Sequence, residues 1–186
     1  GKYPCPSRAA ANLSNLVVTT TCGASRPGTW LYAPATTAIT ASRIHNNASS
    51  GIFVSNGSGE VALTNNVIFQ NSWGIYLNGA TSNSTVTGNN TDNNYIGIYI
   101  ANSSNYNTLS GNSSNWNSGD GIDIVSTSNH NTITGNNASN NATYGIYNDV
   151  STDNTITGNT ANVNGGDGIH ISVASYNNNI TVNSAS

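Results

Sequence analysis

The chain has 186 residues, which is long enough for one domain with a continuous hydrophobic core. Only 6% of the residues are charged and the formal net charge is −3, so the sequence offers no basic surface for nucleic acid. No apolar run approaches the roughly 20 residues that a membrane-spanning helix needs. The composition therefore argues against nucleic-acid partners and against a transmembrane segment.

Residues 1–37 are irregular in pattern and are expected to form an N-terminal cap segment. They contain both cysteines, Cys5 and Cys22, and a bridge between them would contribute roughly 3 kcal/mol of stability. A disulfide is typical of a secreted protein, whereas two free thiols would fit a reducing compartment. The bridge is the favoured alternative, and it points to an extracellular or cell-surface location.

From residue 38 to residue 186 the sequence repeats about every 23 or 24 residues, which indicates a solenoid. Glycine–isoleucine pairs mark the period, at Gly51-Ile52, Gly74-Ile75, Gly97-Ile98, Gly121-Ile122, Gly145-Ile146 and Gly168-Ile169. Each isoleucine is expected to point into the core, because alternate residues of a strand face opposite sides. So short a coil has no room for a helix. We therefore predict an all-β parallel β-solenoid of about six to seven coils.

A second strand in each coil carries one apolar residue between polar or small neighbours. These inward residues are Ile39, Leu63, Val86, Leu109, Ile133, Ile156 and Ile180. Two asparagine columns follow at fixed distances: Asn66, Asn89, Asn112, Asn136, Asn159 and Asn183, and then Asn47, Asn71, Asn94, Asn117, Asn141 and Asn164. Stacked amides hydrogen-bond to the neighbouring coils, and asparagine tolerates left-handed corners. We interpret both columns as structural ladders.

The repeated segment Asn-Thr-Ile-Thr-Gly-Asn, at residues 131–136 and 154–159, is followed by a Gly-Ile pair. It resembles the repeats of NosD-type and carbohydrate-binding/sugar-hydrolase (CASH) domains over about three quarters of the chain. The resemblance implies a single-stranded, right-handed parallel β-helix. Such repeats occur in polysaccharide lyases, hydrolases and epimerases, in copper-site maturation proteins and in surface proteins, so the resemblance selects no single function.

One column of outward-facing positions carries a run of aromatic residues and is named here the outward column. It comprises Phe53, Tyr76, Tyr99, Asp123, Tyr147 and His170. Its four aromatic members, Phe53, Tyr76, Tyr99 and Tyr147, are candidates for contact with sugar rings or with another protein. Pairing of the rings across strands, which would only stabilise the sheet, is the alternative.

The carboxylates gather in the later coils, where Asp120, Asp123, Asp149 and Asp167 accompany His170. The spacing of Asp123 and His170 in one column, two coils apart, would suit an inverting glycosidase, and several carboxylates together can hold Ca²⁺. Solvated surface acids are the favoured interpretation, because no Lys or Arg lies nearby and no long loops wall a cleft. The absence of methionine and the wide spacing of the three histidines argue against a copper site.

Asn-x-Ser/Thr sequons give candidates for N-glycosylation. They lie at Asn12, Asn47, Asn56, Asn83, Asn89, Asn102, Asn112, Asn137, Asn141 and Asn179. In so Asn-rich a chain many arise by chance, but together they agree with a secreted protein.

The C-terminal strand around Ile180 is a candidate assembly edge, because no later coil in the sequence pairs with it. Ile180 and Val182 are expected to point inward and to meet an apolar strand of a second subunit. The candidate partner residues are Leu16, Val17 and Val18. A chain cut from a longer protein is the alternative explanation of this edge.

Two functional hypotheses result. The main one is a non-enzymatic extracellular or cell-surface structural protein, glycosylated and self-assembling into a filament or layer through its ends or flanks. The alternative is a polysaccharide-binding or polysaccharide-processing module that uses the aromatic residues of the outward column and the face formed by Asp120, Asp123, Asp167 and His170. The sequence leaves enzymatic activity open and favours its absence. The one cofactor that the carboxylates suggest is Ca²⁺, and the sequence implies no other.

Overall fold

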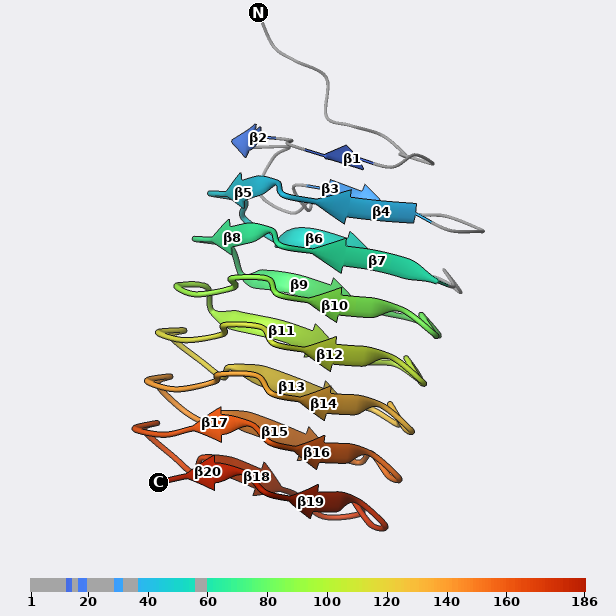
Figure 1. The fold of residues 1–186 in the computed structure, drawn as a ribbon, viewed down its shortest axis with the longest axis vertical. Coiled ribbons are helices and arrows are strands. Elements are labelled where there is room, and N and C mark those ends of the chain that lie inside the picture. Colours follow the sequence, from blue (N-terminus) through green and yellow to red (C-terminus); the bar gives the residue numbers. More distant parts are fainter. Residues whose placement is uncertain (1–12, 15–16, 20–28, 32–36, 56–59) are drawn as a thin grey trace, which may run out of the picture.

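The computed structural model describes residues 13–14, 17–19, 29–31, 37–55 and 60–186. These residues form twenty β-strands, and no helix among them is long and apolar enough to cross a membrane. Successive coils lie on top of one another, and the chain runs from β1 at one end of the stack to β20 at the other (Figure 1). The all-β parallel solenoid predicted from the 23- to 24-residue period is confirmed.

One long side of the solenoid is an eight-stranded parallel sheet. It contains the predicted column in which one inward apolar residue per coil lies between polar or small neighbours. Its strands are β1 (Leu13–Ser14), β4 (Thr37–Thr40), β7 (Val61–Thr64), β10 (Thr85–Thr87), β12 (Thr108–Ser110), β14 (Thr132–Thr134), β16 (Thr155–Thr157) and β19 (Asn179–Thr181). Each inward apolar residue is paired with its equivalent in the next coil, as between Val86 and Leu109.

A seven-stranded parallel sheet carries the glycine–isoleucine repeat and the outward column, and is named here the second sheet. Its strands are β3 (Thr29–Leu31), β6 (Ser50–Val54), β9 (Trp73–Leu77), β11 (Ile96–Ile100), β13 (Ile122–Val125), β15 (Ile146–Asp149) and β18 (Ile169–Ile171).

The third side is narrow and only partly regular. It begins with β2 (Val17–Thr19), β5 (Arg43–His45) and β8 (Val67–Phe69) and ends with β17 (Thr160–Ala161) and β20 (Ser184–Ala185). Isolated bridges through Asn90, Ser113 and Asn137 join the two groups. The middle coils therefore have two regular strands, and their third side is held by isolated bridges instead of a strand.

Three strands lie within the segment for which the sequence predicts an N-terminal cap. β1, β2 and β3 pair in parallel with β4, β5 and β6, so the parallel ladders begin before residue 38. Cys5 and Cys22 lie outside the described residues, and their bridge stays a prediction.

The core is a set of stacked apolar columns that includes Ile52, Ile98, Ile122 and Ile146, all fully buried. Asn148 stands in one of these columns and is also fully buried. Its amide donates to the carbonyl of Ser151, and its oxygen accepts from Asn154. Because both polar atoms are paired, the core accommodates this amide without an unsatisfied group.

Both predicted asparagine columns are continuous hydrogen-bonded ladders. Asn112, for example, donates from Nδ2 to Val86 O and to Asn136 Oδ1, while its own Oδ1 accepts from the backbone and side chain of Asn89. The structure adds a third ladder, which was not predicted from the sequence. It runs through Asn107, Asn131, Asn154 and Asn178, just before the strands of the eight-stranded sheet.

Glycine is required where coils approach most closely. A Cβ on Gly121 would lie 2.6 Å from Gly145 O and 2.9 Å from Ala138 Cβ. At the corners after β10, β12, β14 and β16, glycines such as Gly135 adopt positive φ, and Val182 takes this position in the last coil with φ 56°. The expected inward orientation of Val182 is therefore wrong: the corner turns its side chain outward, and it is 88% exposed.

Candidate functional site on the second sheet

The outward column of the second sheet is in register over six coils. Phe53 pairs with Tyr76 and Tyr76 with Tyr99, then Tyr99 with Asp123, Asp123 with Tyr147, and Tyr147 with His170. The predicted alignment of these residues is confirmed. Asp123 divides the column into an aromatic half toward the N-terminal end and an acidic half toward the C-terminal end.

The aromatic half is a cluster of interacting rings. The ring centroids of Phe53 and Tyr76 are 5.0 Å apart, and those of Tyr76 and Tyr99 are 4.9 Å apart, both edge-to-face. Trp73 joins the cluster at 5.4 Å from Tyr76 and 6.1 Å from Tyr99. Burial raises the pKa of Tyr99 to about 12, helped by Tyr76 and Asp123, so this phenol stays neutral. The rings thus form one half-buried platform.

Trp73 was not recognised from the sequence, although a signal for it exists. It belongs to a column of residues that directly precede the repeating glycines: Ser50, Trp73, Ile96, Asp120, Tyr144 and Asp167. This second column flanks the outward column, and it supplies both the extra rings and two of the carboxylates.

The acidic half combines carboxylates with a second group of rings. Asp120 Oδ1 accepts hydrogen bonds from the Tyr144 backbone N–H at 2.7 Å and from the Thr143 hydroxyl. The Tyr144 ring stacks on His170 at 4.5 Å and on Tyr147 at 5.3 Å. His170 Nδ1 lies 2.6 Å from Asp167 Oδ2. Asp120 is therefore fixed by donors, and Asp167 is paired with the histidine.

Asp123 is the most unusual titratable group among the described residues. It is only 4% exposed, and no described residue donates a hydrogen bond to its Oδ1. Burial raises its pKa well above the ordinary value, and the neighbouring Asp120 raises it further through its charge and a hydrogen bond. Burial and the nearby Asp120 therefore act in the same direction, and Asp123 keeps its proton to higher pH than an isolated aspartate does.

The structure does not gather all the predicted acids into one metal site. Asp120 lies next to Asp123, and Asp167 next to His170, but no three His, Cys, Asp or Glu residues in the described part of the chain are grouped to hold a metal ion. Asp149 belongs to the end of β15, where it pairs with Val125 across the strands. The described carboxylates therefore give no Ca²⁺ cage.

Several predicted glycosylation sites are incompatible with the fold. Asn47, Asn89, Asn112 and Asn141 are buried members of the asparagine ladders. A glycan needs the side-chain nitrogen outside the protein, so these four predictions are wrong. Asn83, Asn102, Asn137 and Asn179 are exposed, whereas Asn12 and Asn56 lie outside the described residues.

The predicted assembly edge is only partly described. Ile180 is 41% exposed in the last coil. Val17 and Val18 belong to β2, which pairs with β5, while Leu16 lies outside the described residues. These positions do not test self-association, which stays a prediction.

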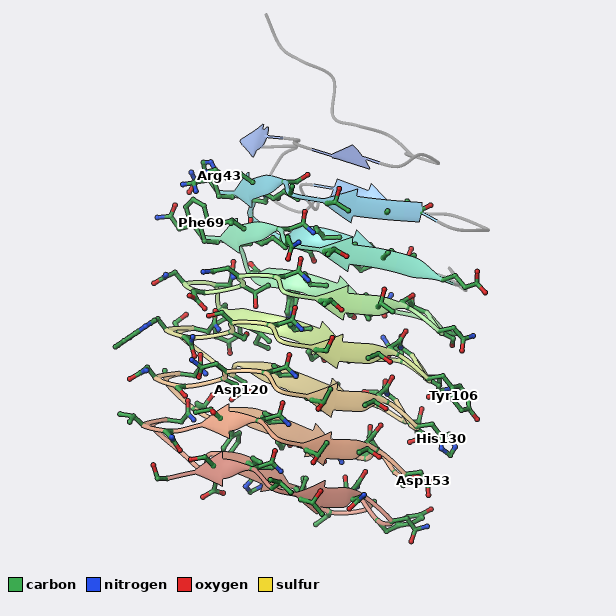
Figure 2. All side chains as sticks on the ribbon, in the orientation of Figure 1. Arg43, Phe69, Tyr106, Asp120, His130 and Asp153 are labelled. Carbon is green, nitrogen blue, oxygen red and sulfur yellow. The ribbon has the colours of Figure 1, made fainter. Side chains whose placement is uncertain are left out.

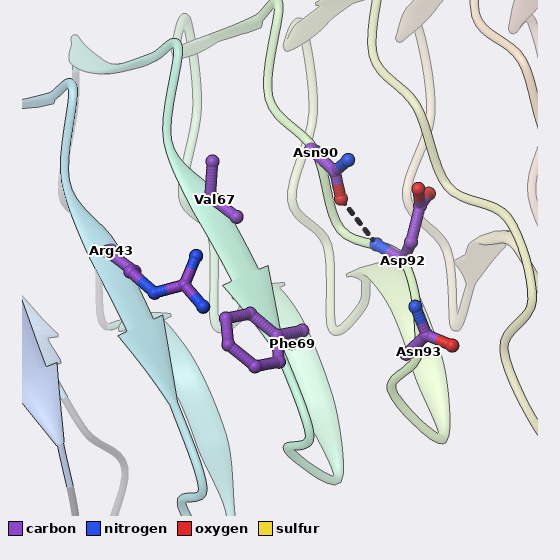
Figure 3. A pocket seen from close by; sticks show the side chains of 6 residues that line it. All are labelled: Arg43, Val67, Phe69, Asn90, Asp92 and Asn93. Carbon is purple, nitrogen blue, oxygen red and sulfur yellow. Dashed lines mark hydrogen bonds between the residues drawn. The ribbon is translucent and has the colours of Figure 1, made fainter.

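A second surface feature is a hollow of about 220 Å³ on the third side (Figure 3). The Arg43 guanidinium lies 4.5 Å from the centroid of the Phe69 ring, and His45 stacks on the same ring at 4.6 Å. Asn90, Asp92 and Asn93 line the opposite side. Figure 2 shows Arg43 and Phe69 toward the N-terminal end of the stack and Asp120 toward the C-terminal end. Arg43 therefore does not contribute its charge to the acidic half.

The fold and its repeats define a class, the right-handed parallel β-helix. The model of the family "Right handed beta helix region" matches residues 9–91, and the model of the family "Periplasmic copper-binding protein (NosD)" matches residues 74–186. The second match covers more than half of the chain, and the chain belongs to that NosD family. Comparison with curated protein sequences gave no match.

Solved structures with the same fold include alginate-modifying enzymes. The A-modules of Azotobacter vinelandii mannuronan C-5 epimerases AlgE4 and AlgE6 match with TM-scores of 0.75 and 0.76 and identities of 16% and 18%, each over 79% of this chain. The periplasmic alginate epimerase AlgG matches with a TM-score of 0.73 and 19% identity over 80% of this chain. The alignments cover 41%, 40% and 39% of those chains, so this chain spans less than half of their length. At these identities the likeness shows the fold alone.

The described residues do not fit the copper in the name of the matched family. The sequence has no methionine, and its three histidines have separate environments. His45 stacks on Phe69, His130 on Tyr106, and His170 pairs with Asp167. Copper prefers sites built from several imidazole or sulfur ligands, and none is grouped within the part of the chain that the structure describes.

Proposed function

We propose that this chain is a polysaccharide-binding β-helix module and that the outward column with its flanking rings is the binding surface. The observation that supports the proposal is the continuity of this column. From Phe53 to His170 it spans five coil spacings, or roughly 24 Å at about 4.8 Å per coil. A surface of this length and shape is suited to several consecutive sugar units.

Rings on both sides of Asp123 give the surface its chemistry. Aromatic side chains offer flat apolar area together with a polar edge, which suits the apolar faces and hydroxyl groups of sugars. Trp73, Tyr76 and Tyr99 form one platform, and Tyr144 with Tyr147 forms another. The carboxyls between them accept hydrogen bonds from hydroxyl groups.

The comparisons favour this proposal over the self-assembling structural protein. The structural neighbours described above are named as epimerases of mannuronan and alginate, although their likeness establishes only the fold. No observation on the described residues supports a filament. We therefore prefer the polysaccharide alternative that the sequence analysis left open.

A second candidate function, polysaccharide processing, is favoured by the Asp120–Asp123 pair. A carboxyl that keeps its proton to higher pH can serve as a general acid, and a second carboxyl beside it supplies the other group that acid–base catalysis uses. Burial and the neighbouring Asp120 raise the pKa of Asp123 in this direction. Asp123→Asn should abolish any processing and retain binding, as measured by product analysis alongside calorimetry.

A location outside the cytoplasm belongs to the same proposal. The matched NosD family and the epimerase AlgG are both described as periplasmic. A polysaccharide-binding module would meet its ligand there or at the cell surface.

The test is a glycan array followed by calorimetry on the strongest ligand. In Tyr76→Ala/Tyr99→Ala, loss of about 1 kcal/mol per ring should weaken binding roughly tenfold or more. Tyr106→Ala/Tyr176→Ala is the matched control, because both tyrosines are exposed and lie outside the outward column. Equal loss in the two variants, or no bound glycan on the array, would contradict the proposal.

A further inference from the structure

The charge distribution of the binding surface restricts the class of sugar that it can accept. Asp120, Asp123 and Asp167 all lie in the acidic half, and Asp149 ends the neighbouring strand β15. The one side chain in this half that can become a cation is His170, which is already paired with Asp167 at 2.6 Å. An anionic sugar would therefore meet carboxylates without a free compensating cation in the described part of this half.

The nearest Lys or Arg within the described residues does not offset the excess of negative charge in the acidic half. It is Arg43, which stands on β5 in the third side of the solenoid and lies over Phe69. It belongs to the coil of Phe53, three coil spacings from Asp123, or about 14 Å along the axis at about 4.8 Å per coil. At this separation its interaction with a ligand over Asp123 is largely screened by physiological salt.

Asp123 gives an independent reason. Its carboxyl is buried between Tyr99 and Tyr147 in the register, and no described residue donates to its Oδ1. A buried acceptor without a donor is unfavourable, and a second acceptor placed over it would increase the cost. Because this oxygen is itself covered by the protein, a ligand acts on it through its charge: a carboxylate above the column raises the cost, and a neutral or cationic group does not.

We propose that the polysaccharide bound on this surface carries no carboxylates and consists of neutral or amino sugars, whose hydroxyl or ammonium groups donate to Asp120 and Asp167. The inference rests on the proposed polysaccharide-binding function. It separates this chain from its structural neighbours, which are named for alginate and mannuronan, both polymers of uronic acids. Within one fold, the charge on the second sheet then decides the class of polymer.

Calorimetry with three hexasaccharides tests the inference: a glucosamine hexamer, a β-1,4-glucose hexamer and a mannuronate hexamer. The mannuronate hexamer should bind at least about tenfold more weakly than the better of the other two, because like charges across an interface are strongly unfavourable. An advantage of glucosamine over glucose identifies an ammonium group as the donor, and equal affinities identify hydroxyl groups.

The decisive variant is Asp120→Asn/Asp167→Asn, in which each amide oxygen still accepts the hydrogen bonds of the original carboxylate. It should improve mannuronate binding several-fold and remove any advantage of glucosamine over glucose. Glu60→Gln/Asp153→Asn removes the same charge from exposed positions outside the second sheet. This control should change neither the affinity for the mannuronate hexamer nor the difference between glucosamine and glucose.

The two proposals fail in different ways. Tighter binding of the mannuronate hexamer than of both other hexamers would overturn this inference and leave polysaccharide binding intact. Equal effects of the two double variants would overturn the assignment to Asp120 and Asp167. Failure of all three hexamers to bind, together with an empty glycan array, would overturn the proposed function and this inference with it.

Discussion

The two halves of the outward column use equivalent strand positions for different chemistry. Tyr76 and Tyr99 occupy the same column as Asp123, and the backbone register does not change between them. In the aromatic half, burial stabilises neutral rings that pack on one another. In the acidic half, the same burial works against ionisation of a carboxyl. The comparison shows that the solenoid supplies a uniform frame and that single side chains decide what each coil can bind.

The largest expected effect comes from the core that supports both halves. Ile122→Asp places a carboxylate in the fully buried column directly beside Asp123. Burying an unpaired charge costs several kcal/mol, which is comparable with the whole stability of a domain. Circular dichroism should show that the variant is unfolded, so that the aromatic half and the acidic half are lost together. A cooperative thermal transition like that of the control Ser118→Asp would contradict the core assignment.

A smaller loss is expected from the ladders that hold successive coils in register. Asn112→Ala removes two donated and two accepted hydrogen bonds inside the protein. Buried groups left unpaired cost about 1–3 kcal/mol each, so we expect a loss of at least about 2 kcal/mol in urea unfolding. Asn137→Ala, at an exposed position, is the control. Similar stabilities of the two variants would show that the ladder carries little energy.

The third prediction concerns the pH dependence of folding stability, to which the acidic half should contribute and the aromatic half should not. The raised pKa of Asp123 means that the folded state binds its proton more tightly than the unfolded state does. Stability should therefore fall as pH rises from the unfolded pKa of about 3.9 through the higher folded pKa. Burial raises the pKa of both Tyr99 and Tyr147, so the two phenols stay neutral over this range, and the charge of Asp120 adds to the effect on Asp123.

Asp123→Asn removes this group and should give a flatter dependence of unfolding free energy on pH. The variant should gain relative to the wild type at neutral pH and not at acidic pH. A wild-type minus Asp123→Asn difference that is constant between acidic and neutral pH would show that Asp123 ionises normally.

The smallest effect is expected at a corner. Val182 adopts φ 56° where four earlier coils have glycine with φ between 60° and 66°. A β-branched residue is strained in this conformation, so Val182→Gly should stabilise the chain by up to about 1 kcal/mol. Ala161→Gly, at a buried strand position outside the positive-φ region, should instead destabilise it. A loss of stability in Val182→Gly would mean that the valine makes contacts that outweigh the strain.

Much of this architecture was predictable because the repeat fixes side-chain direction. Once Gly121-Ile122 and its equivalents were aligned, the inward columns and two asparagine ladders followed. The third ladder, through Asn107 and Asn131, was missed although it has the same period. The orientation of Val182 was mistaken because an alternating pattern was extended past the strand into a corner, where positive φ reverses the side chain.

The sequence by itself determined the fold, the register of the outward column and the near absence of positive charge, because each depends only on period and composition. Only the tertiary structure decided which columns are neighbours. It placed Trp73 against Tyr76 and Tyr99, and it left Asp123 buried beside Asp120 without a donor for its Oδ1 among the described residues. It also buried four candidate glycosylation sites in ladders. The physical reason is that burial and hydrogen bonding depend on contacts between coils. Residues 23 or 24 positions apart in the sequence come into contact only when the coils have folded and stacked.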